Sequence, residues 1–136
     1  MIIGIEHVSF ASPDAAMVMK FFEQFGLHLT YQEDLVKDGI RTCQLDAGNA
    51  TIEIIEPLRA DSSLQRFLDS RGPGIHHVCF RVDNLEETIA QIQAAGLELV
   101  STEPLVDGQG RRVFLHPRSG YGVLMGLVER HPEPPA

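Results

Sequence analysis

Residues 2–10 are rich in β-branched side chains, and their side chains alternate between two faces. This period of two predicts a strand. One face of that strand carries Ile3, Ile5, His7 and Ser9. Ser12 as N-cap and Pro13 as first helical residue then predict a helix, which Gly26 ends as a C-terminal cap. The apolar stripe of this helix consists of Ala16, Val18, Met19, Phe22 and Phe25. Further strands are predicted over residues 27–31, 40–45 and 51–55.

The second half of the chain follows the same order. A short helix, capped by Ser62 or Ser63, is predicted in the connector. A start that resembles a capping box at Asp83, with Glu86 three residues on, predicts a second long helix that ends at Gly96. The strands of this half are predicted over residues 75–82, 97–101, 113–116 and 123–128.

An internal repeat relates the two halves. Ile75-His76-His77-Val78 matches Ile5-Glu6-His7-Val8 at an offset of 77 − 7 = 70 residues, and Gly96-Leu97 matches Gly26-Leu27 at the same offset. This period is too long for a solenoid, so it indicates one domain made from two copies of a βαβββ module. We therefore predict an α+β fold in a single domain over residues 1–136, with module one over about 1–58, a linker helix over about 61–72 and module two over about 73–130.

The composition and the net charge exclude some classes of function. A length of 136 residues suffices for one domain with a real core. The net charge is −8, and because no stretch is dense in Lys or Arg, we expect neither a nucleic-acid partner nor a membrane partner. The start of the chain lacks a secretory signal pattern, which predicts a cytoplasmic protein with Cys43 and Cys79 as reduced, buried thiols.

His7 and His77 occupy matching positions in the first strand of each module, so a pseudo-twofold axis can bring them to one point. Glu53 shares a strand face with Thr51 and Ile55, and a carboxylate on an inward face is costly unless a cation offsets its charge. Two histidines and a carboxylate form a recognised ligand set for Zn, Co, Fe or Mn. A divalent metal site at His7, Glu53 and His77 is the resulting hypothesis.

The plainer interpretations stay open at this point. A single histidine on a strand is more often a half-buried polar residue than a ligand, and a single Glu more often faces solvent. His76 breaks the inward alternation, which suggests a surface residue or a group that supports a ligand. His116 precedes Pro117 at a strand end and fits a pocket residue or a turn residue equally well.

Over residues 3–129 the chain resembles the methylmalonyl-CoA epimerase family of the vicinal oxygen chelate (glyoxalase-like) superfamily. The resemblance rests on the segments Ile5-Glu6-His7-Val8, Ile52-Glu53-Ile54-Ile55-Glu56-Pro57-Leu58, Gly74-Ile75-His76-His77, Arg81-Val82-Asp83, Glu103-Pro104, Arg111, Phe114-Leu115-His116-Pro117-Arg118-Ser119 and Gly122-Val123-Leu124. It implies paired βαβββ modules, a homodimer and one divalent metal ion (Co, Zn, Mn, Fe or Ni). His7, Glu53 and His77 match three of the family's four metal ligands.

Two positions depart from the family pattern. The fourth ligand of the family is a Glu in the last strand, where this chain has Gly126. Some members carry a proton-transferring Glu where this chain has Thr42, so Thr42 and Gln44 are the remaining candidates for a catalytic role. The predicted substrate pocket contains Arg111, His116 and Gly126.

The resemblance implies a divergent epimerase-like enzyme that acts through a metal-stabilised enolate on an acyl-CoA or related carboxylic substrate. Loss of the two Glu positions favours two alternatives. One is another metal-dependent lyase, decarboxylase or oxygenase on the same scaffold. The other is a non-enzymatic protein that binds a small molecule, as resistance-type members of the superfamily do. Retention of His7, Glu53 and His77 disfavours the non-enzymatic binding protein, because an inward-facing Glu53 is costly in a protein that binds no metal.

Overall fold

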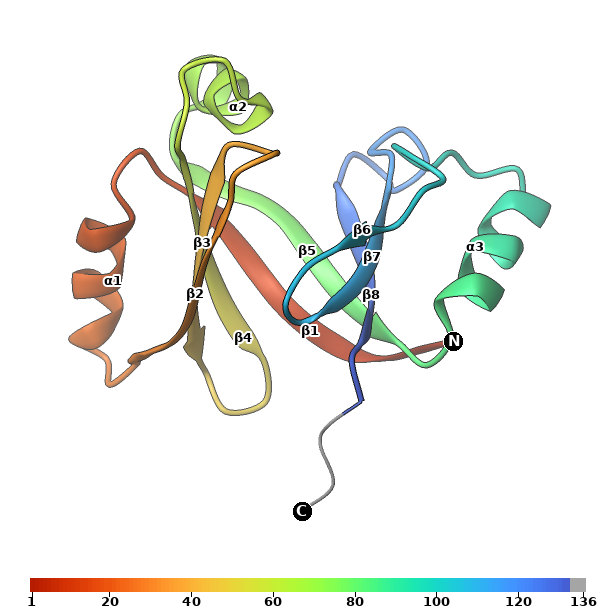
Figure 1. Ribbon diagram of the computed structural model, residues 1–136, viewed down its shortest axis with the longest axis horizontal. Helices are drawn as coiled ribbons and strands as arrows, with labels where there is room; N and C mark the ends of the chain where they lie inside the picture. The colour runs from red at the N-terminus through yellow and green to blue at the C-terminus, as the bar shows by residue number, and fades with distance from the viewer. Residues whose placement is uncertain (133–136) are drawn as a thin grey trace. The chain divides into compact units, whose positions relative to one another are not determined.

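The computed structural model describes residues 1–132, and within them the chain forms the expected βαβββ arrangement twice (Figure 1). The predicted α+β class is thereby confirmed. The first copy and the connecting helix comprise β1 (Ile2–Ala11), α1 (Ala15–Glu23), β2 (Leu29–Leu35), β3 (Ile40–Asp46), β4 (Thr51–Pro57) and α2 (Ser63–Arg71). The second copy comprises β5 (Gly74–Val82), α3 (Leu85–Ala94), β6 (Leu105–Val106), β7 (Gly110–Leu115) and β8 (Met125–Arg130).

The chain divides into two compact units whose boundaries differ from those of the sequence repeat. One unit contains residues 7–76, and among the described residues the other contains 1–6 and 77–132. The strands β1 and β5 therefore each contribute to both units. Hydrogen-bonded neighbours follow the order β2-β3-β4-β1-β5-β8-β7-β6.

In the unit of residues 7–76, the two faces of the sheet have different compositions. The strand β4 pairs in parallel with β1 and antiparallel with β3. Alternate residues such as Cys43, Leu45 and Ile54 are fully buried and pack against α1, through Ala15 and its neighbours. Because side chains alternate along a strand, the residues between them point to the other face. That second face carries His7, Ser9, Thr42, Gln44 and Glu53, all of them buried.

The helix α2 closes one end of this polar face with an apolar cluster. Leu64 and Leu68 of α2 pack with Ala11 of β1 and Ile55 of β4. The N-cap of α2 is Ser62, whose hydroxyl accepts a hydrogen bond from the Gln65 amide, so one of the two predicted caps is correct.

The unit that contains β7 and β8 repeats the same division of faces. Val82, Val113, Leu127 and their neighbours form an apolar cluster with Leu85 and Ile92 of α3. On the opposite face, Cys79 of β5 lies opposite Gly126 of β8, which in turn pairs with Phe114 of β7. Each unit thus covers one sheet face with a helix and leaves the other for different side chains.

Three local predictions are wrong. The N-cap of α1 is Asp14, which accepts a hydrogen bond from the Met17 amide, because Ser12 is occupied by a bond from the Asp14 amide. The N-cap of α3 is Asn84, while Asp83 pairs with the N-terminal amine at 2.9 Å. The strand predicted over residues 97–101 is reduced to one bridge, between Leu99 and Leu115.

Both cysteines are buried and free, as the sequence predicted. Within residues 1–132, no helix has the length and apolar character needed to cross a bilayer.

Candidate metal centre

The carboxylate of Glu53 is held by hydroxyl groups from two neighbouring strands. Glu53 is only 5% exposed, and its position in β4 lies opposite Ser9 in β1. The Ser9 hydroxyl donates to Oε1 at 2.7 Å, and the Thr42 hydroxyl donates to Oε2 at 2.8 Å. These bonds compensate part of the cost of burying an anion.

The imidazole of His7 lies beside the same carboxylate. His7 is 1% exposed, and its Nε2 is 3.4 Å from Oε1 of Glu53. Because His7 and Ser9 are two residues apart on β1, both side chains point to the face of the sheet that carries Glu53. The expected inward orientation of His7 and Glu53 is thus observed.

His77 is 5% exposed and contacts an aromatic ring. Its imidazole meets the edge of Phe114 with ring centroids 5.2 Å apart and an interplanar angle of 87°. An edge-to-face arrangement is favourable for aromatic pairs and restrains the orientation of the imidazole. The adjacent His76 instead packs against Phe67 of α2, and burial lowers the pKa of His76.

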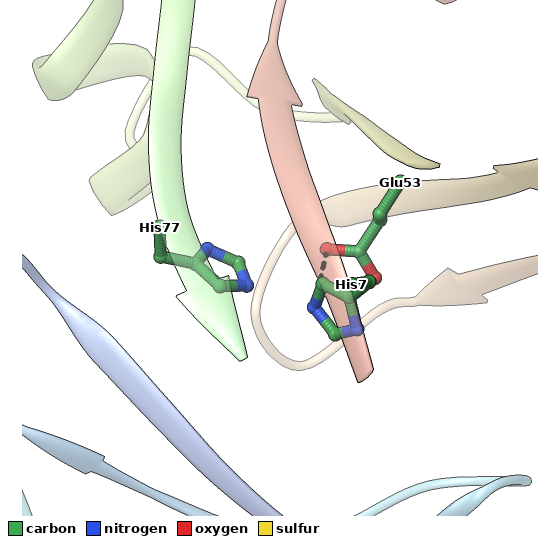
Figure 2. Close-up of side chains that lie close together, drawn as sticks. All are labelled: His7, Glu53 and His77. Atoms are coloured by element: carbon green, nitrogen blue, oxygen red, sulfur yellow. Dashed lines mark ion pairs between the residues drawn. The ribbon is translucent and has the colours of Figure 1, made fainter. Parts of the chain in front are cut away.

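His7, Glu53 and His77 each offer one ligand atom, and these atoms lie within 4.8 Å of one another (Figure 2). The donor set consists of two imidazoles and one carboxylate, all buried. This set fits Zn and the other divalent transition metals, which take imidazole nitrogen and carboxylate oxygen together.

Gly126, where the family pattern has a Glu, is enclosed by its neighbours. A Cβ on Gly126 would lie 2.9 Å from Sγ of Cys79 and 3.2 Å from the Phe114 ring. Neither distance is an ordinary van der Waals contact, so the glycine permits close packing of Cys79 and Phe114. A larger residue at this position requires a neighbour to move.

The other candidate residues lie in different surroundings. Gln44 is buried and lies opposite Glu53 across β3 and β4, so Gln44 and Thr42 both belong to the face that carries the carboxylate. His116 accepts a hydrogen bond from the Arg118 amide through Nδ1 at 3.0 Å.

Arg111 forms ion pairs with Glu86 at 2.6 Å and with Glu129 at 3.2 Å. The hydrogen bond that Arg111 donates to the Glu86 carboxylate is the main cause that raises the pKa of Arg111. Glu129 also accepts a hydrogen bond from the Leu85 amide at the start of α3. These contacts occupy the Glu129 carboxylate at the start of α3.

Sequence reasoning assigned no role to Ser9 or Phe114. The alternation of β1 placed Ser9 on the same face as His7, which was an available signal for Ser9. No comparable signal pointed to Phe114, because its contact with His77 depends on how β5, β7 and β8 pair.

Comparison with known proteins identifies the family of this chain. The family model described as the Glyoxalase/Bleomycin resistance protein/Dioxygenase superfamily matches residues 6–114. An ethylmalonyl-CoA/methylmalonyl-CoA epimerase of Cereibacter sphaeroides is 30% identical over 133 residues, which cover 95% of this chain and 99% of that protein. The mitochondrial methylmalonyl-CoA epimerase of Dictyostelium discoideum is 30% identical, with 93% of this chain and 78% of that protein covered.

A solved structure of methylmalonyl-CoA epimerase from Mycobacterium tuberculosis superposes with a TM-score of 0.91 at 31% identity, covering 96% of this chain and 90% of that one. A methylmalonyl-CoA epimerase in complex with methylmalonyl-CoA and NH4+ has a TM-score of 0.89 at 28% identity, with 96% of each chain covered. The chain therefore belongs to the glyoxalase/bleomycin resistance protein/dioxygenase superfamily and, within it, to the methylmalonyl-CoA epimerase-like enzymes.

Proposed function

We propose that this protein is a metal-dependent isomerase of the epimerase type that acts on an acyl-CoA with an acidic α-carbon. The observation that carries the proposal is the His7, Glu53 and His77 donor set in a chain 30% identical to an epimerase over nearly its full length. The relatives named as epimerases act on methylmalonyl-CoA or ethylmalonyl-CoA, and a similar solved structure holds methylmalonyl-CoA. A proton next to a thioester carbonyl is removed and returned through an enolate in such a reaction.

His7, Glu53 and His77 would hold the divalent metal, and the fit rests on their burial and mutual distances. When bound, the cation supplies positive charge that stabilises negative charge on a substrate oxygen. The protein's own contribution is to fix the ligands before the metal arrives: Ser9 and Thr42 hold Glu53, and Phe114 restrains the ring of His77. Because these side chains are already held in place, less conformational entropy is lost when the metal binds.

Proton transfer is the step for which this chain differs from its family. Thr42 donates its hydroxyl hydrogen to Glu53, and Gly126 has no side chain. Gln44 is buried on the same face and is the remaining candidate. Because an amide does not titrate near neutral pH, its role would be to orient a water molecule that carries the proton.

A second candidate function is a lyase, decarboxylase or oxygenase that uses the same three ligands. The observation that favours it is the absence of Glu at two positions of the family pattern, the proton-transferring position at Thr42 and the fourth-ligand position at Gly126. Those reactions do not require a proton to be removed from one face of a carbon and returned to the opposite face. As for assembly, a homodimer remains a prediction from the family resemblance.

The two functions are separated by deuterium exchange. Purified protein is loaded with Co²⁺, Zn²⁺ or Mn²⁺, its metal content is measured, and methylmalonyl-CoA is incubated with it in D₂O. We expect one metal ion per chain and incorporation of deuterium at the α-carbon, with loss of both in His77→Ala. Metal binding without exchange would favour the second candidate. Absence of stoichiometric metal in the wild type would contradict both.

A further inference from the structure

We infer that Ser9 and Thr42 are positioning residues that orient Glu53 for metal ligation through one oxygen, the one beside His7; this inference rests on the proposed metal site. The two hydroxyl groups come from β1 and β3, on either side of the strand that carries Glu53. They donate to different oxygens of the same carboxylate, at 2.7 Å and 2.8 Å.

The geometry of the bonds distinguishes the two carboxylate oxygens. Oε1 accepts from Ser9 and lies 3.4 Å from Nε2 of His7. Oε2 accepts from Thr42. Since both oxygens are engaged by donors from opposite sides, rotation of the carboxylate breaks at least one bond. The arrangement therefore keeps Oε1 next to the imidazole nitrogen with which it would share a metal.

Burial of the three side chains makes the two hydrogen bonds difficult to replace. Ser9, Thr42 and Glu53 are each less than a tenth exposed, so solvent is a poor substitute for a lost hydroxyl donor. Groups that hydrogen-bond to metal ligands commonly change metal affinity by about 10–100-fold when they are removed. Thr42 would therefore orient the Glu53 carboxylate, at the position where some members of the family have a proton-transferring Glu.

The test compares Thr42→Val, Thr42→Ser and Ser9→Ala with the wild type. Thr42→Val keeps the shape of the side chain and removes the hydroxyl, whereas Thr42→Ser keeps the hydroxyl. The matched control is Thr30→Val in the same unit, because the Thr30 hydroxyl donates to the Gln44 backbone carbonyl and not to Glu53. The Kd for Co²⁺ and Zn²⁺ is measured by competition with a chelator, and the visible spectrum of the Co²⁺ protein reports the ligand geometry.

We expect Thr42→Val and Ser9→Ala to weaken Co²⁺ and Zn²⁺ binding by about 10-fold or more and to change the Co²⁺ spectrum. Thr42→Ser should restore affinity and spectrum, and Thr30→Val should leave both unchanged. Circular dichroism and thermal unfolding of the metal-free proteins establish that the variants are folded, and a variant that does not fold is replaced by Ser9→Gly or Thr42→Ala.

The outcomes separate this inference from the proposed function. Wild-type affinity in both hydroxyl-deficient variants, with a normal metal content, would overturn the role of Ser9 and Thr42 and leave the metal site intact. If Thr30→Val weakened metal binding as much as Thr42→Val, the role of Ser9 and Thr42 would also be overturned, because the loss of affinity would not depend on a hydrogen bond to Glu53. A wild type that binds no metal would overturn the metal site and, with it, this inference.

Discussion

Sγ of Cys79 lies 2.9 Å from the position that the Cβ of a larger residue at Gly126 would occupy. The two residues are opposite one another in the parallel pair of β5 and β8. The absence of a side chain at Gly126, the family's fourth ligand position, therefore leaves room for the Cys79 side chain. A larger residue there would clash with Cys79, which the sequence pattern alone does not reveal.

The first prediction is that Gly126→Ala destabilises the protein by about 1–3 kcal/mol, the usual cost of overpacking a filled site. Cys79→Ala removes the sulfur, so the Cys79→Ala/Gly126→Ala double variant should lose less than the sum of the two single variants. The measurement is urea unfolding of all four proteins in a double-mutant cycle. Additive losses would show that the two side chains do not compete for the same space.

The second prediction concerns metal affinity. With Cys79→Ala as background, Gly126→Glu should tighten the binding of Co²⁺ or Zn²⁺, because a carboxylate replaces a ligand from solvent. Gly126→Gln in the same background is the control, since it has nearly the same volume without the charge. Chelator competition gives the affinities, and equal values for the Glu and Gln variants would contradict the assignment of this position.

Third, His77→Ala should lose most of the bound metal while the fold is retained, because the change removes one of the three proposed ligands. His76→Ala is the matched control, since His76 is adjacent in sequence but packs against Phe67. Metal content by elemental analysis and unfolding by circular dichroism are measured side by side. Unchanged metal content in His77→Ala would remove His77 from the ligand set.

A fourth prediction concerns Glu6, which is 6% exposed and pairs with Arg81 at 3.1 Å and with Arg130 at 2.7 Å. Its removal leaves two cations without their shared anion, but both arginines are partly exposed and remain partly hydrated. We therefore expect Glu6→Ala to cost about 1–3 kcal/mol, below the range for a fully buried pair. Glu86→Ala, which removes an exposed partner of Arg111, should cost less in the same urea titration.

The sequence and the structure agree where the signal is periodic. The 70-residue offset predicted the repeated βαβββ order. The alternation along the strands of His7 and Glu53 predicted the inward direction of both side chains, because a strand has a fixed two-residue repeat. The cap positions at Asp14 and Asn84 were missed, since several neighbouring residues can each accept a hydrogen bond and only the backbone path decides among them.

Contacts that depend on strand pairing were also beyond the sequence. Ser9 and Thr42 meet on Glu53 only because β1 and β3 flank β4. The crowding at Gly126 likewise follows from β5 and β7 flanking β8. The strand predicted over residues 97–101 was too long because apolar composition suggested a full strand, while Leu99 makes the one bridge in that segment.

The last prediction is that the buried thiol of Cys43 makes stability fall at alkaline pH. Burial is the main cause that raises the pKa of Cys43, followed by the charge of Glu56. An unfolded thiol loses its proton near pH 9.0, whereas the folded thiol keeps it to higher pH. Above that pH the native state binds more protons than the unfolded state, so the free energy of unfolding decreases as pH rises.

Urea unfolding between pH 7 and pH 10 should therefore show a steeper loss of stability in the wild type than in Cys43→Ala, although Cys43→Ala is less stable at pH 7 because it leaves a cavity. Thiol reagents give an independent check on burial. Cys43 and Cys79 are both fully buried, so the native protein should react slowly at pH 8 and should yield two thiols per chain in urea. Parallel pH profiles for the wild type and Cys43→Ala would show that another group governs the alkaline loss.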